Sequence, residues 1–302
     1  MNQKIYRLNV NHNEQNMRLD LFISKKIPEI SRSKAKQLIL EGKVLISNQI
    51  MRKADHRVKT NEYIQVHHEE KDTDELIPQD IPLKIIYEDN SIIAIDKPSG
   101  MVVHPGAGNI SHTLVNALIF LRLEIKSVGH EKRPGIVHRL DKETSGIIVV
   151  AKNQKTYLAL QNQFRKREIS KEYLAIIHGN LQAKTGKIDY SLGRDLRDRK
   201  KISPKTKKGR EALTFYKILD EKKGFSFIKL TPKTGRTHQI RVHLSSIGSP
   251  ILGDKKYGKK KDTFPRMALH SYSIEFFHPE KKEKVKLYSP LPSELKEIWD
   301  RL

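Results

Sequence analysis

A short polar segment, "GIVHRLDKETSG" (residues 135–146), combines the residue types that chemistry on a bound molecule requires. It places His138, Arg139, Asp141 and Lys142 between two glycines, with apolar, strand-like sequence on both sides. We therefore expect a loop that joins two buried strands, a common position for functional residues. The carboxylate can act as a nucleophile or base, and the cations can bind an anionic substrate. The alternative is a solvated turn with a charge pair.

A second segment, "TGRTHQIRVHLSSIG" (residues 234–248), has its apolar residues at helical spacing, with His238 and Arg241 on the opposite face. An arginine on that polar face can pair with Asp141 and hold the carboxylate ionised. Arg236, which precedes the helix, is the alternative partner and can instead bind phosphate. The spacing does not decide between the two arginines.

The chain has a strong excess of positive charge. Its 302 residues include 58 Lys and Arg against 35 Asp and Glu, which gives a formal net charge of +23 at pH 7. Such an excess attracts polyanions, so nucleic acid is the expected partner. An anionic membrane is the competing partner, but the sequence shows neither a basic amphipathic helix nor a lipidation site.

The composition excludes several other classes of protein. The sequence contains no cysteine, which excludes disulfides, thiolate zinc sites and cysteine nucleophiles. No stretch approaches the roughly 18 apolar residues of a membrane span, and the start lacks the pattern of a secretory signal. We expect a soluble, cytoplasmic and monomeric protein without a membrane partner, and the length favours two domains.

Residues 1–66 are predicted to form a small domain. Ser31 is a typical N-cap for the helix "RSKAKQLILE", and two short strands follow. Within this helix Arg32, Lys34 and Lys36 are expected to be exposed, where they can bind phosphate. The unit resembles an S4 RNA-binding domain, with the resemblance carried from Arg18 to Gln49. An ordinary helical domain with a solvated basic face is the alternative.

Residues 67–84 are predicted to be a linker, because they include six acidic residues and two prolines. Residues 85–302 then alternate strand-like runs with helices. We expect an α+β catalytic domain with a mixed, largely antiparallel sheet and flanking helices. Within it, residues 194–210 hold nine basic and two acidic residues and should form an exposed loop or hairpin. The lysines predicted to contact RNA there are Lys200, Lys201, Lys207 and Lys208, although a solubilising charge run is the alternative.

The segments "HRLDKETSG", "REISKEYLAI", "GRTHQIR" and "PILGDKKYG", in this order, resemble the RluA-type pseudouridine synthases. With the S4-like start, the resemblance covers nearly the whole chain. It implies isomerisation of uridine in RNA, in which the uracil is detached at N1, turned and rejoined to the ribose through C5. No cofactor and no metal are implied. The expected substrate is a stem-loop of large-subunit ribosomal RNA, as naked RNA or in a pre-ribosomal particle.

The resemblance also implies roles for individual residues. Asp141 takes the place of the catalytic aspartate, acting either by covalent attack on the sugar C1′ or as a base on the sugar. Tyr173 matches the active-site tyrosine, although a core strand tyrosine is the alternative. Arg241 matches the arginine that pairs with the aspartate, and Arg139 matches a residue that fills the space left by the flipped base. The further residues predicted to contact RNA are His138, Lys142, Arg236 and His238.

The sequence leaves two alternative functions open. In a metal-dependent hydrolase His138, Asp141, His238 and His243 would gather around a divalent ion, but their spacing matches no metal motif and His243 is better interpreted as a core residue. In a non-catalytic protein of ribosome assembly the fold would bind RNA without chemistry. The presence of Asp141, Tyr173 and Arg241 together favours an enzyme.

Overall fold

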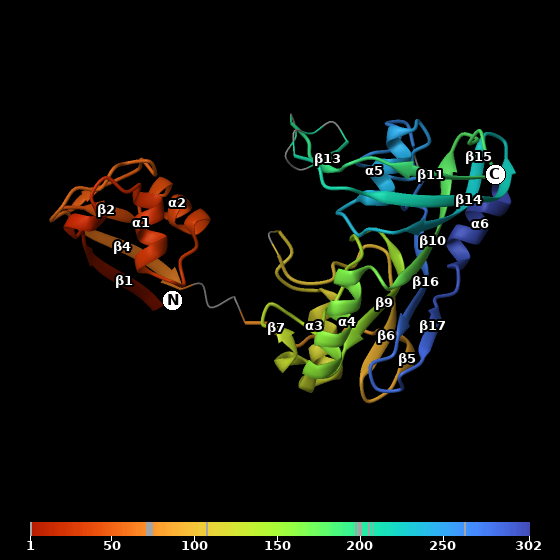
Figure 1. The fold of residues 1–302 in the computed structure, drawn as a ribbon, viewed down its shortest axis with the longest axis horizontal. Coiled ribbons are helices and arrows are strands. Elements are labelled where there is room, and N and C mark those ends of the chain that lie inside the picture. The colour runs from red at the N-terminus through yellow and green to blue at the C-terminus, as the bar shows by residue number, and fades with distance from the viewer. Residues whose placement is uncertain are drawn as a thin grey trace. The chain divides into compact units, whose positions relative to one another are not determined.

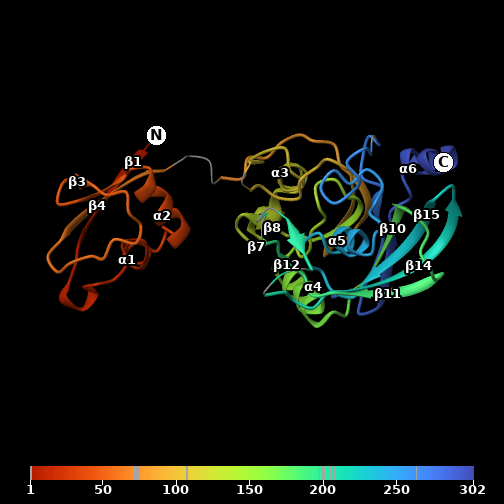
Figure 2. The same ribbon diagram turned by 90° about the horizontal axis from the view of Figure 1, so that it is seen from above.

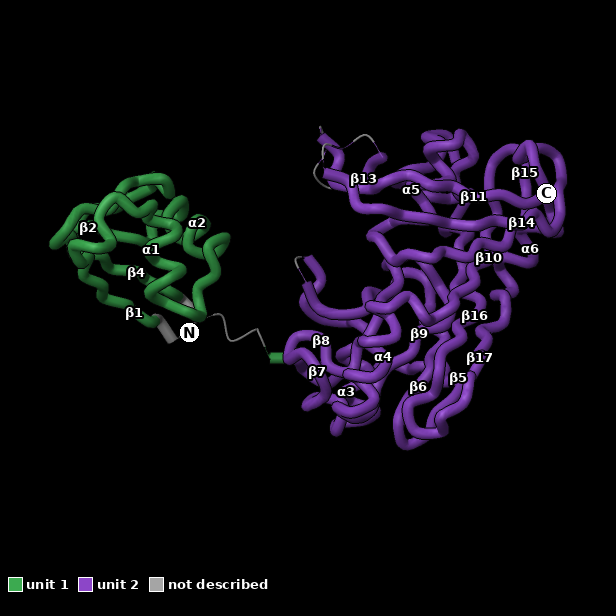
Figure 3. The backbone as a smooth tube through the Cα atoms, viewed as in Figure 1, with its two compact units in different colours: residues 1–75 green, residues 76–302 purple. Residues whose placement is uncertain are grey.

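The computed structural model divides into two compact units, residues 1–75 and residues 76–302 (Figure 3). It describes residues 2–70, 75–106, 108–196, 198, 201–204, 206, 208–262 and 264–302. Two of the predicted RNA contacts, Lys200 and Lys207, lie outside the described residues. Within the described residues no helix has the length and apolar character needed to cross a membrane.

The N-terminal unit packs two helices against a four-stranded sheet with strand order β1-β4-β2-β3 (Figure 1). In chain order its elements are β1 (Asn2–Asn9), the 3-10 helix η1 (His12–Glu14), α1 (Leu19–Lys26), α2 (Arg32–Leu40), β2 (Val44–Ile46), β3 (Gln49–Ile50) and β4 (Tyr63–Glu70). Helix α2 and the strands β2 and β4 were predicted from the sequence. Strand β1 was not, because its polar residues give no clear alternation.

Helix α2 begins as its sequence predicts. The Ser31 side chain accepts a hydrogen bond from the backbone N–H of Lys34, at 3.3 Å, and so caps the first turn. The apolar face of the helix is buried in the core of the unit. On the opposite face Arg32 and Lys36 are exposed and Lys34 is partly exposed. The predicted basic face of α2 is therefore present.

The connection between the units differs from the predicted linker at both of its ends. Strand β4 continues to Glu70, which pairs with Asn2 of β1. Leu76 is buried in the core of the second unit, and the carbonyl of Ile77 accepts a 2.8 Å hydrogen bond from Asn116. Pairing with β1, which the sequence did not reveal, draws residues 67–70 into the sheet.

Among the described residues of the second unit, a nine-stranded sheet has strand order β11-β14-β15-β10-β16-β9-β6-β5, with β17 paired to β16. Only the β9–β16 pairing is parallel, so the predicted mixed, largely antiparallel α+β fold is confirmed. The strands are β5 (Lys84–Glu88), β6 (Ile92–Lys97), β9 (Ser145–Ala151), β10 (Ser170–His178), β11 (Thr185–Asp189), β14 (Leu213–Lys222), β15 (Phe225–Pro232), β16 (Leu269–Phe277) and β17 (Lys284–Tyr288).

Helices flank this sheet (Figures 1 and 2). They are α3 (Leu114–Leu121), the 3-10 helix η2 (Leu123–Ser127), α4 (Gln154–Lys166), α5 (Gln239–Ser246) and α6 (Ser293–Arg301). Strand β9 is buried along its whole length: Ile148 and Val150 pack in the cluster that contains α3, whereas Ile147 and Val149 pack with α4 residues. A strand covered on both faces explains the unbroken apolar run in its sequence.

One expectation about the Asp141 loop is wrong. The residues before it do not form a strand, because Ile136 makes only an isolated bridge to Val150. The loop instead joins the short strand β8 (Arg133–Pro134), which pairs with β7 (Gly129–His130), to β9. Gly135, with φ of 68°, turns the chain directly after Pro134 and so ends β8.

The basic segment forms the predicted hairpin within the described residues. Its strands are β12 (Gly193–Arg194) and β13 (Ile202–Ser203), paired antiparallel. Lys201 and Lys208 are exposed there. These lysines are thus accessible to a polyanion.

Candidate active site

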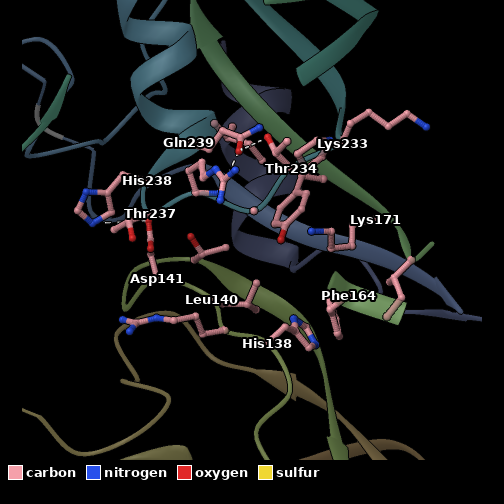
Figure 4. Close-up of a pocket in the computed structure, with 18 of the residues that line it drawn as sticks. His138, Leu140, Asp141, Phe164, Lys171, Lys233, Thr234, Thr237, His238 and Gln239 are labelled. Carbon is pink, nitrogen blue, oxygen red and sulfur yellow. Dashed lines mark hydrogen bonds and ion pairs between the residues drawn. The ribbon is translucent and has the colours of Figure 1, made fainter. Parts of the chain in front are cut away.

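A pocket of about 560 Å³ in the second unit is lined by Asp141 (Figure 4). Of the residues predicted from the sequence, those that line it are Asp141, Tyr173, Arg241, His138, Arg139, Arg236 and His238. Lys142 is exposed but is not part of the pocket wall, and Lys201 and Lys208 belong to the hairpin. Arg32, Lys34 and Lys36 lie in the N-terminal unit.

The backbone around Asp141 is fixed by a neighbouring loop. The buried ammonium of Lys97 donates to the carbonyl oxygens of Met101, at 2.9 Å, and Lys142, at 3.1 Å. The Ser99 hydroxyl donates to the carbonyl of Glu143 at 2.7 Å. These bonds hold the carbonyls directly after Asp141, so the carboxylate stands on a preorganised loop.

The glycines at the ends of the segment allow close backbone approach, as expected. A Cβ atom at Gly146, where φ is 110°, would collide with the backbone of Ser271 on β16. A Cβ at Gly135 would lie 2.7 Å from the carbonyl oxygen of Ala151. Both positions therefore require glycine for packing and for conformation.

Arg241 is the arginine that binds Asp141. Its Nη1 lies 3.1 Å from Asp141 Oδ2, while its Nε and Nη2 bind both oxygens of Asp254 at 2.8 Å. Arg236 points elsewhere and donates from Nε to the carbonyl of Glu211 at 3.1 Å. Burial acts to lower the pKa of Arg241, but the bonds to Asp254 outweigh it and the pKa is raised. The guanidinium is thus a permanent cation beside Asp141.

Asp254 was missed by the sequence reasoning. Its segment, "PILGDKKYG", was noted as part of the resemblance, but no role was given to the carboxylate. Burial acts to raise the pKa of Asp254, and the bonds from Arg241 reverse this effect, so the pKa is lowered. Its backbone contacts, from the N–H groups of Lys256 and Tyr257 at 2.9 and 3.0 Å, fix the carboxylate that holds Arg241.

The entry to helix α5 places His238 beside the carboxylate. His238 has a left-handed backbone (φ of 54°), and its Nε2 lies 4.0 Å from Asp141 Oδ2. Its Nδ1 is 2.8 Å from the hydroxyl of Tyr257. Burial lowers the pKa of His238, with opposing contributions from Asp141 and Arg241. The buried side chain of Gln239 fixes this turn by binding Thr234 and the backbone of Leu213.

Tyr257 connects the basic hairpin to the pocket. Its hydroxyl accepts a 2.9 Å hydrogen bond from the backbone N–H of Ile202 on β13. Its ring lies 5.1 Å from the guanidinium carbon of Arg241. One side chain therefore touches the hairpin, His238 and the arginine that holds Asp141.

Tyr173 reaches the pocket from β10 beside an irregularity in the sheet. The register between β10 and β16 shifts between Glu172 and Tyr173, so that Tyr272 of β16 is passed over. Bulges of this kind redirect side chains near active sites. Burial raises the pKa of Tyr173 to about 12, so the hydroxyl keeps its proton at neutral pH.

His138 and Arg139 occupy different parts of the pocket. The His138 ring stacks on Phe164, with 4.9 Å between the centroids, and its Nε2 accepts a 3.0 Å hydrogen bond from the N–H of Val149. Burial lowers its pKa to about 3, so the ring is neutral. His138 therefore supports the wall of the pocket, while Arg139 is exposed at its rim.

Several pocket residues were not recognised in the sequence. Exposed cations at the rim are contributed by the end of α4 and the turn after β15, namely Arg165, Arg167 and Lys233. Phe164 and Lys171 line the interior. Lys171 and Tyr173 are two residues apart in one strand, and residues at this spacing share a face of the strand. Because Tyr173 was predicted to lie in the site, this spacing could have identified Lys171 as a second residue of the pocket.

Three residues of the metal-site alternative, His138, Asp141 and His238, line the same pocket, but His243 is not part of its wall. His243 is buried, with its Nδ1 3.0 Å from the Thr214 hydroxyl, as expected for a core histidine. The Nε2 of His138 is occupied by Val149. Across the parts of the chain that the structure describes, no group of three or more His, Cys, Asp or Glu side chains is arranged to hold a metal ion.

Both units of the chain match known protein families. Residues 91–246 match the RNA pseudouridylate synthase family, and residues 17–64 match the S4 domain. An RNA pseudouridine synthase of Aquifex aeolicus is 40% identical over 296 residues, covering 94% of this chain and 93% of that protein. A protein of Xanthomonas campestris named ribosomal large subunit pseudouridine synthase D is 38% identical over 299 residues, covering 94% and 88%.

A solved human structure, RNA pseudouridylate synthase domain containing 4, is similar with a TM-score of 0.58 and 27% identity, covering 72% of this chain and 92% of that one. The matched ranges include the Asp141 loop, β10 and α5, which together build the pocket. The chain therefore belongs to the RluA-type family of RNA pseudouridine synthases, isomerases that convert uridine to pseudouridine in RNA, and it carries an S4 domain in its N-terminal unit.

Proposed function

We propose that Asp141 is the catalytic carboxylate with which this enzyme isomerises uridine. One observation carries the proposal: Asp141 lines the pocket and is bound by Arg241, which Asp254 holds in turn. The bond from the arginine fixes the direction of the carboxylate. An ionised, oriented carboxylate can attack the sugar C1′ or remove a proton from the sugar.

The same pocket supports roles for Tyr173 and Arg139. The Tyr173 ring forms part of the interior wall, where it can stack on a uracil that has left the RNA helix. Arg139 is exposed at the rim, two residues from Asp141, where its guanidinium can fill the space left by the flipped base. Unstacking a base costs a few kcal/mol, which such an insertion offsets.

We propose a stem-loop of large-subunit ribosomal RNA as the substrate, either naked or within a pre-ribosomal particle. The support is the name of relatives such as the Xanthomonas protein, together with the basic surfaces of the chain. These surfaces are the outer face of α2 in the S4 domain and the β12–β13 hairpin. We assign residues 1–66 to RNA binding and residues 85–302 to catalysis.

The experiment that tests the catalytic assignment is tritium release from ribosomal RNA that carries 5-tritiated uridine, in the presence of EDTA. The wild type should release tritium, and Asp141→Asn should reduce the rate by at least about 10³-fold while RNA binding persists. Glu143→Gln is the matched control and should remain active. It changes an exposed side chain of the same loop, two residues after Asp141. Turnover by Asp141→Asn at the wild-type rate would overturn the assignment.

A further inference from the structure

We propose that Lys171 binds the uracil ring of the target nucleotide, with its ammonium donating a hydrogen bond to a carbonyl oxygen of the base. This inference rests on the proposed catalytic use of the Asp141 pocket. It assigns to Lys171 the recognition of uracil and the stabilisation of the base after it has been detached.

Lys171 lies on the same face of β10 as Tyr173, and both side chains line the pocket. Its Nζ is 5.9 Å from the centre of the Phe164 ring. A Cβ atom built on Gly235 would be 3.7 Å from the same nitrogen. The lysine therefore extends from the sheet to the turn that precedes α5, and in Figure 4 its ammonium end is directed toward the interior.

No carboxylate among the described residues forms an ion pair with Lys171. The adjacent Glu172 points to the other face of the strand, where it binds Lys229 at 3.0 Å and Lys286 at 3.1 Å. Burial alone lowers the pKa of Lys171. The Phe164 ring lies near this cation, but a buried cation without a carboxylate partner is still costly, so a group that reaches the pocket with the substrate is the natural counterpart.

The position of Lys171 favours the base over a phosphate. Phosphates remain at the RNA backbone outside the pocket, where the exposed cations Arg139, Arg165 and Lys233 are available. Lys171 instead lies in the interior beside Phe164 and Tyr173, which are suited to a flat ring. An ammonium has three donors and no acceptor, so it can bind O4 of uracil, whereas cytosine carries an amino group at that position and is mismatched to it.

The reaction makes this contact stronger as it proceeds. When the bond between N1 and C1′ breaks, its electron pair leaves with the uracil, and the negative charge spreads to the ring carbonyl oxygens. A fixed cation binds this anion more tightly than it binds the neutral base of the substrate. Interactions that strengthen in this way lower the barrier rather than only improving binding.

The test compares Lys171→Met with the wild type in the tritium-release assay. Methionine keeps the length of the side chain and removes the charge. We expect kcat to fall by about 10²-fold, the usual size of such an electrostatic effect, while the affinity for RNA changes by less than about threefold. Lys171→Arg, which keeps the cation, should restore part of kcat. Lys233→Met at the rim is the matched control and should raise KM with little change in kcat.

Stability separates this role from a structural one. Removing a buried cation that has no carboxylate partner should leave the melting temperature of Lys171→Met equal to or above that of the wild type. Lower activity with undiminished stability therefore supports the proposal. An unchanged kcat, a change confined to KM, or a fall in kcat that accompanies a lower melting temperature would each overturn it.

A binding experiment without turnover gives a second readout. The wild type should bind RNA with uridine at the target position more tightly than the same RNA with cytidine there. In Lys171→Met this ratio should approach one, and an unchanged ratio would contradict uracil recognition. If instead wild type releases tritium and Asp141→Asn does so equally, the proposed function fails and not only the role of Lys171.

Discussion

In the N-terminal unit one buried aspartate binds two arginines, whereas in the catalytic unit one buried arginine binds two aspartates. The Asp20 oxygens accept from Arg18 at 3.1 Å and from Arg32 at 3.2 Å, and 55% of the Arg32 side chain is exposed. The side chain of Arg241 is only 8% exposed, and it binds Asp254 and Asp141.

The surplus charge in each cluster has the sign that its proposed role needs. Around Asp20 the net charge is positive, and the surplus guanidinium faces solvent, where phosphates of RNA can reach it. Around Arg241 the net charge is negative, and the surplus carboxylate, Asp141, faces the pocket. Phosphate binding tolerates mobile, solvated cations, whereas catalysis needs a carboxylate held in one direction.

Among changes to the residues that position Asp141, the largest effect should come from Asp254, on the far side of Arg241. Asp254→Asn keeps the shape but removes the charge that fixes Arg241. We expect kcat to fall by about 10²-fold and the free energy of unfolding to fall by about 3 kcal/mol, because a buried pair loses one partner. Tritium release and denaturant unfolding measure the two effects. Activity equal to that of the wild type would show that Arg241 needs no second carboxylate.

Asp20→Asn is the matched control for this change, because it alters another buried aspartate between arginines. It should destabilise the S4 domain without changing kcat.

The pKa of Asp254 is lowered from its usual value of 3.8, so its contribution to stability is complete above about pH 4 and is lost as the pH falls below that value. Asp254→Asn should therefore lose less stability than the wild type on acidification.

The next effect concerns the connection between the hairpin and the catalytic cluster. Tyr257→Phe removes the hydroxyl that binds Ile202 and His238 but keeps the ring against Arg241. Losing a buried hydrogen bond costs about 1 to 2 kcal/mol, so we expect kcat/KM to fall by about tenfold. Tyr190→Phe, on an exposed tyrosine, should have no effect. Equal kcat/KM in the two variants would exclude a role for the connection.

The hairpin lysines should affect binding rather than chemistry. Changing Lys201 and Lys208 together to glutamine should make the affinity for RNA less dependent on salt. The slope of log K against log salt concentration should become less steep by about 0.7 to 0.9 for each phosphate that the protein no longer neutralises. Affinity measured at several salt concentrations tests this. Glutamine at Lys282 and Lys284, near the β16–β17 turn, is the control. An identical slope in both pairs would favour a merely solubilising hairpin.

The smallest effect is expected from the outer face of α2. Changing Arg32 and Lys36 to glutamine should weaken RNA binding by about threefold and leave kcat unchanged, since exposed cations contribute little individually. Arg18 remains paired to Asp20 in this variant. Binding and single-turnover assays separate the two parameters, and a fall in kcat would show that the S4 domain acts on the chemical step.

Local sequence determined much of this protein. The apolar run of β9, the Ser31 cap of α2 and the spacing of α5 each specify an element through interactions within a few residues. The segment around Asp141 and its resemblance to a known family predicted residues that line the pocket, among them Asp141, Tyr173 and Arg241. Charge excess alone indicated a polyanionic partner.

Only the tertiary structure decided which side chains meet. Contacts between distant segments decide that Arg241 rather than Arg236 binds Asp141 and that Asp254 holds Arg241. They also leave Lys171 beside the Phe164 ring with no carboxylate partner within the described chain. The bulge beside Tyr173 depends on the register of β16, which no pattern within β10 encodes. Helical or strand periodicity gives the face of an element, but the partner of that face is fixed only when the elements pack.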